Sequence, residues 1–263
     1  MTVPIYQVDA FTDAPFKGNP AAVVLLETPA EAGWMRSVAA EMNLSETAFV
    51  CPREGGFNLR WFTPKVEVEL CGHATLASAH VLWESGVVPV GDDIAFSTLS
   101  GTLNITRELE LICMDFPAAD VIPGILPEGV LTAIGAEPDF TGISGEKWLL
   151  EFADESTVRC LAPDFAALRR IRGRGLIATS RSSRPGVDFV SRYFAPWVGI
   201  DEDPVTGPAH TILATYWAEQ LGKSQLIAQQ VSSRGGTLRM KLSGDRVWIA
   251  GQAVTVFRGE LFV

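Results

Sequence analysis

Short apolar runs, separated by polar or glycine- and proline-containing breaks, recur along the whole chain and predict many strands. Residues 5–11 alternate between apolar and polar side chains, which is the period of a strand with one buried face. Residues 21–26 are apolar throughout and predict a fully buried strand. Runs of the same kind predict further strands at 47–50, 57–62, 94–96, 103–105, 109–113, 148–150, 176–179 and 187–194, around 238, and at 247–249 and 254–257.

Two longer apolar segments predict helices in the interior. Residues 73–83 are apolar on nearly all sides, as in a helix that is buried all round, and residues 209–221 form the second helix of this kind. We expect such a helix to run through the middle of a curled sheet rather than across its face. Two other helices are expected upstream of them, an amphipathic one over 29–42 and a shorter one over 163–170.

The second half of the chain repeats the first. Arg-Trp-Phe-Thr-Pro at 60–64 is answered by Arg-Tyr-Phe-Ala-Pro at 192–196, and Cys-Gly-His-Ala at 71–74 is answered by Thr-Gly-Pro-Ala at 206–209. In each half the second motif stands where one of the apolar helices begins. Two halves with one order of elements predict a protein with pseudo-twofold symmetry.

The chain is expected to form two domains. The stretch 115–129 is rich in proline and glycine and is the best candidate for the boundary. We therefore predict an N-terminal half over 1–117 and a C-terminal half over 118–263, each large enough to bury a core. In a protein of this kind we expect the ligand site in the cleft between the two halves.

Composition and charge narrow the choice of partners. The 263 residues are 47% hydrophobic and 20% charged, as in a well-packed globular protein. The net charge of −10 argues against nucleic acid and anionic membrane surfaces as partners. The sequence shows no N-terminal secretion signal and no apolar run of about 18 residues. We expect a soluble cytoplasmic protein that acts on a small metabolite.

The cysteines and glycines offer no cofactor motif. Cys51, Cys71, Cys113 and Cys160 are scattered, without the close spacing that is typical of zinc sites or of a disulfide framework. The glycines form neither a dinucleotide-binding nor a phosphate-binding pattern. We therefore expect reduced thiols, no bound metal and no cofactor.

The starts of the two apolar helices are candidate anion sites. Gly72 and His73 stand where the first N–H groups of a helix have no internal partner and where the helix dipole is positive. A glycine there lets a ligand approach the backbone closely. Gly207 repeats this arrangement in the second half. The two helix starts are expected to hold an anionic group, most simply a carboxylate.

Four side chains close to these helix starts are candidates for acid–base chemistry, namely Glu46, Cys71, His73 and Asp203. Desolvation in a closed apolar cleft raises the pKa of a carboxyl group, so that it can take up and return a proton. This chemistry suits the relocation of a proton without a cofactor. Structural roles stay open for all four: a turn for Glu46 and Asp203, helix-start packing for His73, and a small core residue for Cys71.

Motifs spread along the whole chain carry a resemblance to a known family. They are Asp-Ala-Phe-Thr at 9–12, Phe-x-Gly-Asn-Pro-Ala-Ala-Val at 16–23, Met-Asn-Leu-Ser-Glu-Thr at 42–47, Phe-Thr-Pro at 62–64, Cys-Gly-His-Ala-Thr at 71–75 and Glu-Asp-Pro-Val-Thr-Gly at 202–207. In these motifs the chain resembles the PhzF family, which comprises the phenazine-biosynthesis isomerase and its relatives. The resemblance implies the α+β fold of diaminopimelate epimerase, in which two pseudo-twofold-related domains each curl a mostly antiparallel, barrel-like sheet around a central helix.

The resemblance also implies an activity. Glu46 becomes the general acid/base that moves a proton on the substrate, and His73 and Asp203 become its catalytic companions. The chain is then expected to be a cofactor-independent isomerase of a small carboxylate-bearing metabolite, similar to enzymes of phenazine biosynthesis. A homodimer is expected from the same resemblance.

Substrate binding is implied at four further positions. Asn19 belongs to a matching motif, and Gly72 and Gly207 would bind substrate through backbone N–H groups. The family pattern continues with Ser after the second Gly, whereas this chain has Pro208. That departure affects the second anion site directly, because proline has no N–H group.

Two other functions remain open at this stage. The epimerases and racemases of this fold carry a cysteine before the glycine at both helix starts, and this chain has Cys71 at the first and Thr206 at the second. Threonine is a poor proton carrier near neutral pH, so a one-thiol epimerase, racemase or dehydratase reaction at Cys71 is the alternative chemistry. A non-catalytic metabolite-binding protein is the third possibility.

Overall fold

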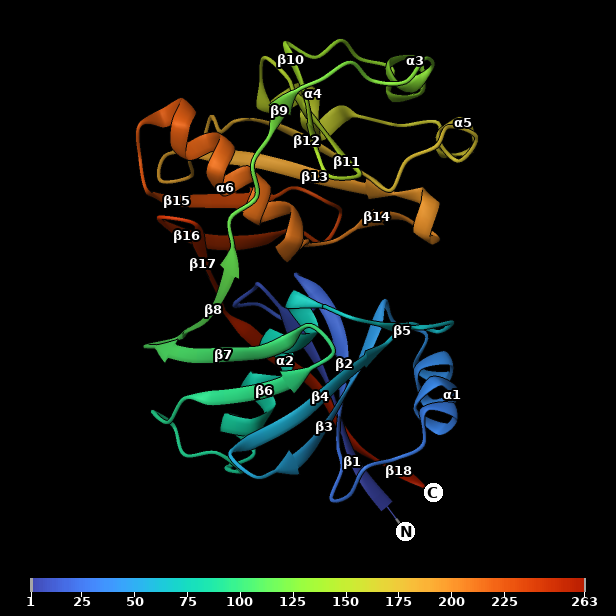
Figure 1. The fold of residues 1–263 in the computed structure, drawn as a ribbon, viewed down its shortest axis with the longest axis vertical. Coiled ribbons are helices and arrows are strands. Elements are labelled where there is room, and N and C mark those ends of the chain that lie inside the picture. The colour runs from blue at the N-terminus through green and yellow to red at the C-terminus, as the bar shows by residue number, and fades with distance from the viewer. Residues whose placement is uncertain (1, 263) are drawn as a thin grey trace. The chain divides into compact units, whose positions relative to one another are not determined.

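The computed structural model describes residues 2–262 and divides the chain into two compact units (Figure 1). The first unit comprises Met1–Asp115 and Ala250–Val263, and the second comprises Phe116–Ile249. These units differ from contiguous halves by the C-terminal strand. β18 (Ala253–Phe262) belongs to the first unit because it pairs along its length with β1 (Thr2–Ala10).

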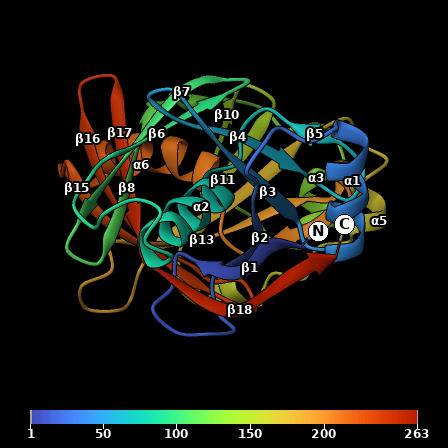
Figure 2. The same cartoon turned by 90° about the horizontal axis from the view of Figure 1, so that it is seen from below.

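The first unit is a curled sheet built around one helix (Figures 1 and 2). The strands β18, β1, β2, β3 and β4 pair in that order, and β4 also pairs with β5 and β6, followed by β7 and β8. All these pairs are antiparallel except β2–β3 and β4–β6. The remaining elements are β2 (Asn19–Leu25), α1 (Ala32–Met42), β3 (Glu46–Arg53), β4 (Gly56–Phe62), β5 (Glu67–Val68), α2 (Gly72–Glu84), β6 (Ile94–Thr98), β7 (Gly101–Glu108) and β8 (Leu111–Pro117).

The central helix of this unit is α2. Eleven of its thirteen residues are buried, and it contacts β1, β2, β3 and β18. This confirms the prediction of a helix buried on all sides, which rests on its lack of a polar face. Small residues such as Ala74 and Ala77 let the strands approach the helix closely, and the larger Leu76 side chain is fully buried among them.

The strand β2 is covered on both faces, which explains why its sequence is apolar without alternation. Val24 packs in one cluster with Met35 of α1. Ala21 and Val23 alternate with that face and are fully buried on the side that α2 covers. The helix α1 ends at Met42, and Asn43 follows in the left-handed conformation that commonly closes a helix.

The second unit repeats this plan, with α6 (Gly207–Leu221) as its central helix. Its strands β9 to β14 pair in order, β13 is also parallel to β15, and β16 and β17 follow. The parallel pairs β11–β12 and β13–β15 match β2–β3 and β4–β6 of the first unit. The elements are β9 (Ile122–Pro123), α3 (Val130–Ile134), β10 (Phe140–Ser144), β11 (Lys147–Glu151), α4 (Glu155–Cys160), α5 (Phe165–Leu168), β12 (Gly175–Arg181), β13 (Phe189–Ala195), η1 (Pro196–Val198), β14 (Ile200–Asp203), β15 (Gln225–Gln230), β16 (Gly236–Ser243) and β17 (Arg246–Gly251).

The repeated Arg-aromatic-Phe motif has the same contacts in both units. In the first, Arg60 forms two 2.7 Å hydrogen bonds with Glu67, and its guanidinium lies 5.2 Å from the centre of the Phe62 ring. In β4 and β5, Phe62 and Glu67 are direct cross-strand partners. The bidentate ion pair therefore fixes the short strand β5 against β4.

The second copy of the motif has the same strand register and the same side-chain contacts. Arg192 bonds Glu202 at 2.7 and 3.0 Å and lies 4.8 Å from the centre of the Phe194 ring, and Phe194 pairs with Glu202 across the strands. The repeat seen in the sequence is thus a repeat of structure, because the same three side chains perform the same task. It also aligns Asp203 with Val68, the residues that directly follow the two glutamates.

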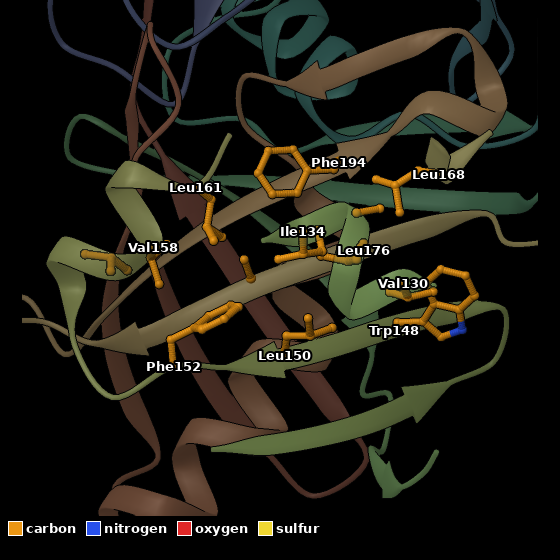
Figure 3. Packing of buried hydrophobic residues seen from close by; sticks show 13 residues of the cluster. Val130, Ile134, Trp148, Leu150, Phe152, Val158, Leu161, Leu168, Leu176 and Phe194 are labelled. Carbon is orange, nitrogen blue, oxygen red and sulfur yellow. The ribbon is translucent and has the colours of Figure 1, made fainter. Parts of the chain in front are cut away.

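The second unit covers the outer face of its sheet with the short helices α3, α4 and α5. Figure 3 shows their side chains packed with those of β11, β12 and β13. The sequence analysis predicted one helix over 163–170, whereas the structure has α5, which is shorter, preceded by α4. The acidic stretch 196–206 contains η1 and β14. The strands β10 and β15 and the helix α3 were missed, because each is short and weakly periodic.

Within the described residues, the helices are all too short or too polar to cross a bilayer. The four cysteines, all within the described residues, form no disulfide with one another.

We predict that Leu76→Ala lowers the free energy of unfolding by about 2–5 kcal/mol, because α2 is enclosed and its neighbours cannot fill the cavity. Val90→Ala, at a position with 70% exposure, is the control and should change stability by less than about 0.5 kcal/mol. Urea unfolding of the three proteins measures both values. Equal losses would show that α2 is not the enclosed element.

Candidate active site

The N-terminal ends of two parallel strands bring the first group of predicted site residues together. Asn19 is the first residue of β2 and Glu46 is the first residue of β3. Because β2 and β3 run parallel, with Ala21 opposite Glu46, both strands begin at the same edge of the sheet. The helix α2 also begins at this edge, and its second residue, His73, contacts both Asn19 and Glu46.

The imidazole of His73 is the centre of this cluster. Its Nδ1 lies 3.2 Å from Nδ2 of Asn19 and 3.5 Å from Sγ of Cys71. Its Nε2 lies 3.4 Å from Oε2 of Glu46. The structure therefore places Asn19, Glu46, Cys71 and His73 in one constellation within the first unit.

Hydrogen bonding and burial define the protonation state of His73. The amide nitrogen of Asn19 is a donor, so Nδ1 accepts and the ring proton lies on Nε2, facing Glu46. Burial lowers the pKa of His73 to about 3, because the charged imidazolium is poorly solvated there. His73 is neutral at pH 7. Its Nε2 is buried and has no hydrogen-bond partner among residues 2–262, as expected of a group that binds a ligand.

The loop before β2 holds Asn19 in place. Gly18 has a φ of +62°, and a Cβ atom there would lie 2.1 Å from the carbonyl oxygen of Ala10. Only glycine fits this turn without displacing backbone. The carboxylate of Asp9 accepts the N–H of Phe16 at 2.7 Å and ties the loop to β1. The Gly-Asn pair of the sequence motif is thus explained by a backbone constraint followed by a site residue.

The second unit has a polar cluster at the corresponding place, where β14 leads into α6. Thr206 donates its hydroxyl to the carboxylate of Asp203. The side chain of Gln230 accepts the N–H of Thr206 at 2.9 Å and donates to the carbonyl of Asp203 at 2.6 Å. Gln230 is 1% exposed and fixes the turn between Asp203 and the helix. The sequence analysis missed Gln230, since it lies far along the chain in an unremarkable strand.

The two helix starts share one further hydrogen bond. In α2, the hydroxyl of Thr75 donates to the carbonyl of Cys71 at 2.6 Å. In α6, Nδ1 of His210 donates to the carbonyl of Thr206 at 2.8 Å, and Nε2 of His210 lies 3.3 Å from the hydroxyl of Ser191. Both ring nitrogens of His210 have partners, which indicates a structural role for this residue.

Gly207 and Pro208 are the first two residues of α6. Gly207 is buried and Pro208 half-buried. Proline fits there, since the first turn of a helix has N–H groups without internal acceptors. Pro208 nevertheless removes one of the N–H groups that the first turn offers to an anion. The first turn of α2 keeps all of them.

The repeat is chemically asymmetric. The shared strand registers align Glu46 with Gly175, and the helix starts align His73 with Pro208. At Gly175 a Cβ atom would lie 2.1 Å from the hydroxyl of Tyr193, so the second unit has no space for a side chain there. Among the described residues, the Glu46–His73 pair has no counterpart at these positions of the second unit, which carries Asp203 at the end of the strand before its own helix.

The architecture of each unit, a curled α+β sheet around a buried helix, is that of epimerase-like proteins. A predicted epimerase from Pseudomonas aeruginosa has this fold with a TM-score of 0.77 at 19% identity, covering 99% of both chains. The sequence profile of the phenazine biosynthesis-like proteins, PhzC-PhzF, matches residues 8–259. The chain therefore belongs to the PhzF family, which confirms the resemblance seen in its motifs.

Two relatives show how far the similarity extends. An uncharacterized isomerase from Halalkalibacterium halodurans is 49% identical over 264 residues and is matched over the whole of both chains. A crystal structure of a PhzF-family protein from Enterococcus faecalis has a TM-score of 0.94 at 42% identity, again over the full length of both chains.

We predict that stability falls as the pH drops from 6.5 towards 4, because His73 and His210 stay neutral in the fold while the unfolded chain takes up protons. Burial lowers the pKa of His210 to about 4 and that of His73 to about 3. The stabilisation from these depressed pKa values is complete above the ordinary value of 6.5. As the pH falls below 6.5, each of the two histidines lowers the free energy of unfolding by about 1.4 kcal/mol per pH unit, until its pKa in the folded protein is reached.

His210→Asn tests this linkage, because the Asn amide can keep the bond to the Thr206 carbonyl without titrating. Between pH 7 and pH 4.5 the variant should lose roughly 2 kcal/mol less stability than the parent protein. Urea unfolding at both pH values measures the difference. Parallel pH dependences would contradict a neutral, buried His210.

Proposed function

We propose that this protein is a cofactor-independent isomerase that moves a proton on a small carboxylate-bearing metabolite, with Glu46 as the general acid/base. Membership of the PhzF family and the isomerase name of a 49%-identical relative support an isomerase-like function. The observation that carries the specific proposal is the pairing of Glu46 with a neutral histidine, 3.4 Å away, at the start of a helix.

The cluster fits a proton transfer. A general base needs a lone pair on a carboxylate that lies beside the substrate, and Glu46 is 16% exposed at its side chain, so it is sheltered but accessible. His73 presents Nε2–H towards the same point. Neutral His73 carries its ring proton on Nε2, and this N–H can donate a hydrogen bond to a negative charge that develops on the substrate. Asn19 holds the ring in this tautomer.

The helix start of α2 supports carboxylate binding next to this base. The N–H groups of Gly72, His73 and Ala74 belong to the first turn of the helix, where they have no internal acceptor. A carboxylate bound to them gains from the positive end of the helix dipole. We propose Asp203 as a second catalytic group, and the first turn of α6 at Gly207 and Pro208 as a second, weaker binding position in the second unit.

A one-thiol reaction at Cys71 is the second candidate, and the 3.5 Å distance between Sγ and His73 is the observation in its favour. A cysteine nucleophile or base usually works as a thiolate beside a histidinium ion. Burial lowers the pKa of His73 to about 3, so its ring is a weak acceptor for the thiol proton. The chemistry of the cluster therefore favours Glu46 over Cys71 as the group that carries the proton.

We predict that Glu46→Gln abolishes solvent-proton exchange, because the amide keeps the shape of the side chain but has no basic lone pair. A thermal-shift screen of small carboxylates identifies ligands, and NMR in D₂O then measures exchange of their protons. The loss should be at least about 100-fold, the lower range for removal of an acid–base group.

Two variants make this result specific. Glu41→Gln makes the same chemical change at an exposed position of α1 and should exchange like the parent protein. Cys71→Ser should retain exchange if Glu46 carries the proton, and should lose it if Cys71 does. Full exchange in Glu46→Gln would remove Glu46 from the mechanism, and ligand binding without exchange in the parent protein would indicate a metabolite-binding protein.

We also predict that Pro208→Ser tightens the binding of simple carboxylates by about tenfold or more. The serine restores an N–H group and adds a hydroxyl, and one hydrogen bond to a charged group contributes about 1.5–3 kcal/mol. Stability should change by less than about 1 kcal/mol at this half-buried position. Calorimetric titration of both proteins with one carboxylate decides it. Equal affinities would show that Pro208 does not face the ligand.

A further inference from the structure

The cluster around His73 combines three types of metal ligand. One donor atom each from Glu46, Cys71 and His73 lies within 4.8 Å of the other two, a grouping that holds among residues 2–262. A thiolate, an imidazole and a carboxylate are the ligands that Zn²⁺ takes most readily in proteins. The sequence shows no zinc motif because the three residues are not close together along the chain. Cys71 and His73 stand at the start of α2, whereas Glu46 is the first residue of β3.

The distances suit a small tetrahedral ion. Zinc binds sulfur at about 2.3 Å and nitrogen or oxygen at about 2.0–2.1 Å, which places neighbouring ligand atoms roughly 3.4–3.6 Å apart. One ion binds through a single ring nitrogen, and for Nε2 the 3.4 Å separation from Oε2 of Glu46 already matches. The ligand atoms of the three residues lie within 4.8 Å of one another, so the thiol has to approach the other two on binding.

Burial and charge support the same reading. The His73 side chain is 7% exposed, and its Nε2 is a buried polar atom without a hydrogen-bond partner among the described residues. A Zn²⁺ ion bound through Nε2 would give this nitrogen a partner. The positive end of α2 opposes a cation by about half a charge. That is outweighed by the thiolate of Cys71 and the carboxylate of Glu46, which neutralise both charges of Zn²⁺ at bonding distance.

We propose that Cys71, His73 and Glu46 form a zinc-binding site, and that Zn²⁺ bound there blocks proton transfer by Glu46. On binding, the S–H bond of Cys71 breaks, its proton leaves to solvent and an S–Zn bond forms, with no change of oxidation state. The ring proton of His73 moves from Nε2 to Nδ1, where the Asn19 amide turns to accept it through its oxygen, and Nε2 then binds the ion. One imidazole nitrogen and one carboxylate oxygen complete three ligands, and the fourth position is left for water or a substrate oxygen. The blocking rests on the proposed function, whereas the binding does not.

Cobalt titration of the purified protein tests the binding. Co²⁺ in a site with one cysteine gives intense visible bands of a four-coordinate ion and a sulfur-to-cobalt charge-transfer band in the near ultraviolet. We expect both bands to saturate at one Co²⁺ per chain and to vanish on addition of Zn²⁺. An absence of these bands at excess Co²⁺ would overturn the proposal.

Variants assign the ligands. Cys71→Ser should lose the charge-transfer band, and Glu46→Gln should weaken Co²⁺ binding by at least tenfold, with circular dichroism confirming that both variants are folded. Cys160→Ser removes the exposed thiol and should behave like the parent protein. A charge-transfer band that disappears in Cys160→Ser but persists in Cys71→Ser would place the metal elsewhere and reject the site.

Inhibition is measured separately, so that the two proposals can fail independently. Zn²⁺ should stop the solvent-proton exchange of the parent protein, a chelator should restore it, and Cys71→Ser should need at least tenfold more Zn²⁺. Cobalt bands together with full exchange in Glu46→Gln would reject the proposed function and keep the zinc site. Exchange that depends on Glu46, without cobalt bands, would do the reverse.

Discussion

The complete burial of α2 is the constraint on which the candidate site depends. A helix enclosed by β1, β2, β3 and β18 has one permitted position along its axis, so its first turn must lie where the two parallel strands begin. That position sets the distances from His73 to Asn19 and Glu46. The chemistry of the site is therefore held by packing in the core rather than by a loop that could move.

The internal repeat shows how one scaffold serves two purposes. Both units keep the arginine–glutamate ion pair and the two parallel strand pairs. Both also keep a hydrogen bond from the side chain of the fourth helical residue to the carbonyl of the residue before the helix. These shared features maintain the fold. The positions of Glu46 and His73 correspond to Gly175 and Pro208 in the other unit, so the carboxylate–imidazole pair belongs to one copy, whereas the backbone arrangement that presents it belongs to both.

The electrostatics of the cluster come from desolvation. Burial keeps His73 neutral beside a carboxylate, although such a neighbour on its own favours the charged imidazole. A neutral ring can donate a hydrogen bond through one nitrogen or offer a lone pair to a metal. The proposed proton transfer and the proposed zinc binding therefore draw on the same property, which is an uncharged imidazole between a thiol and a carboxylate.

The sequence by itself determined the fold class, the repeat, the two buried helices and four members of the constellation. The repeat and the two buried helices follow from patterns in the chain itself, such as an apolar run without a polar face, whereas the fold class and the role of Asn19 are implied by the resemblance to the PhzF family. The tertiary structure decided the rest. It assigned β18 to the first unit, shortened the helix expected over 163–170 to α5 with α4 before it, and joined Gln230 to the turn at Asp203. It also placed Cys71, His73 and Glu46 within reach of one ion. Those outcomes depend on pairing between residues far apart in the chain, and hydrophobic periodicity carries no record of which strands become neighbours.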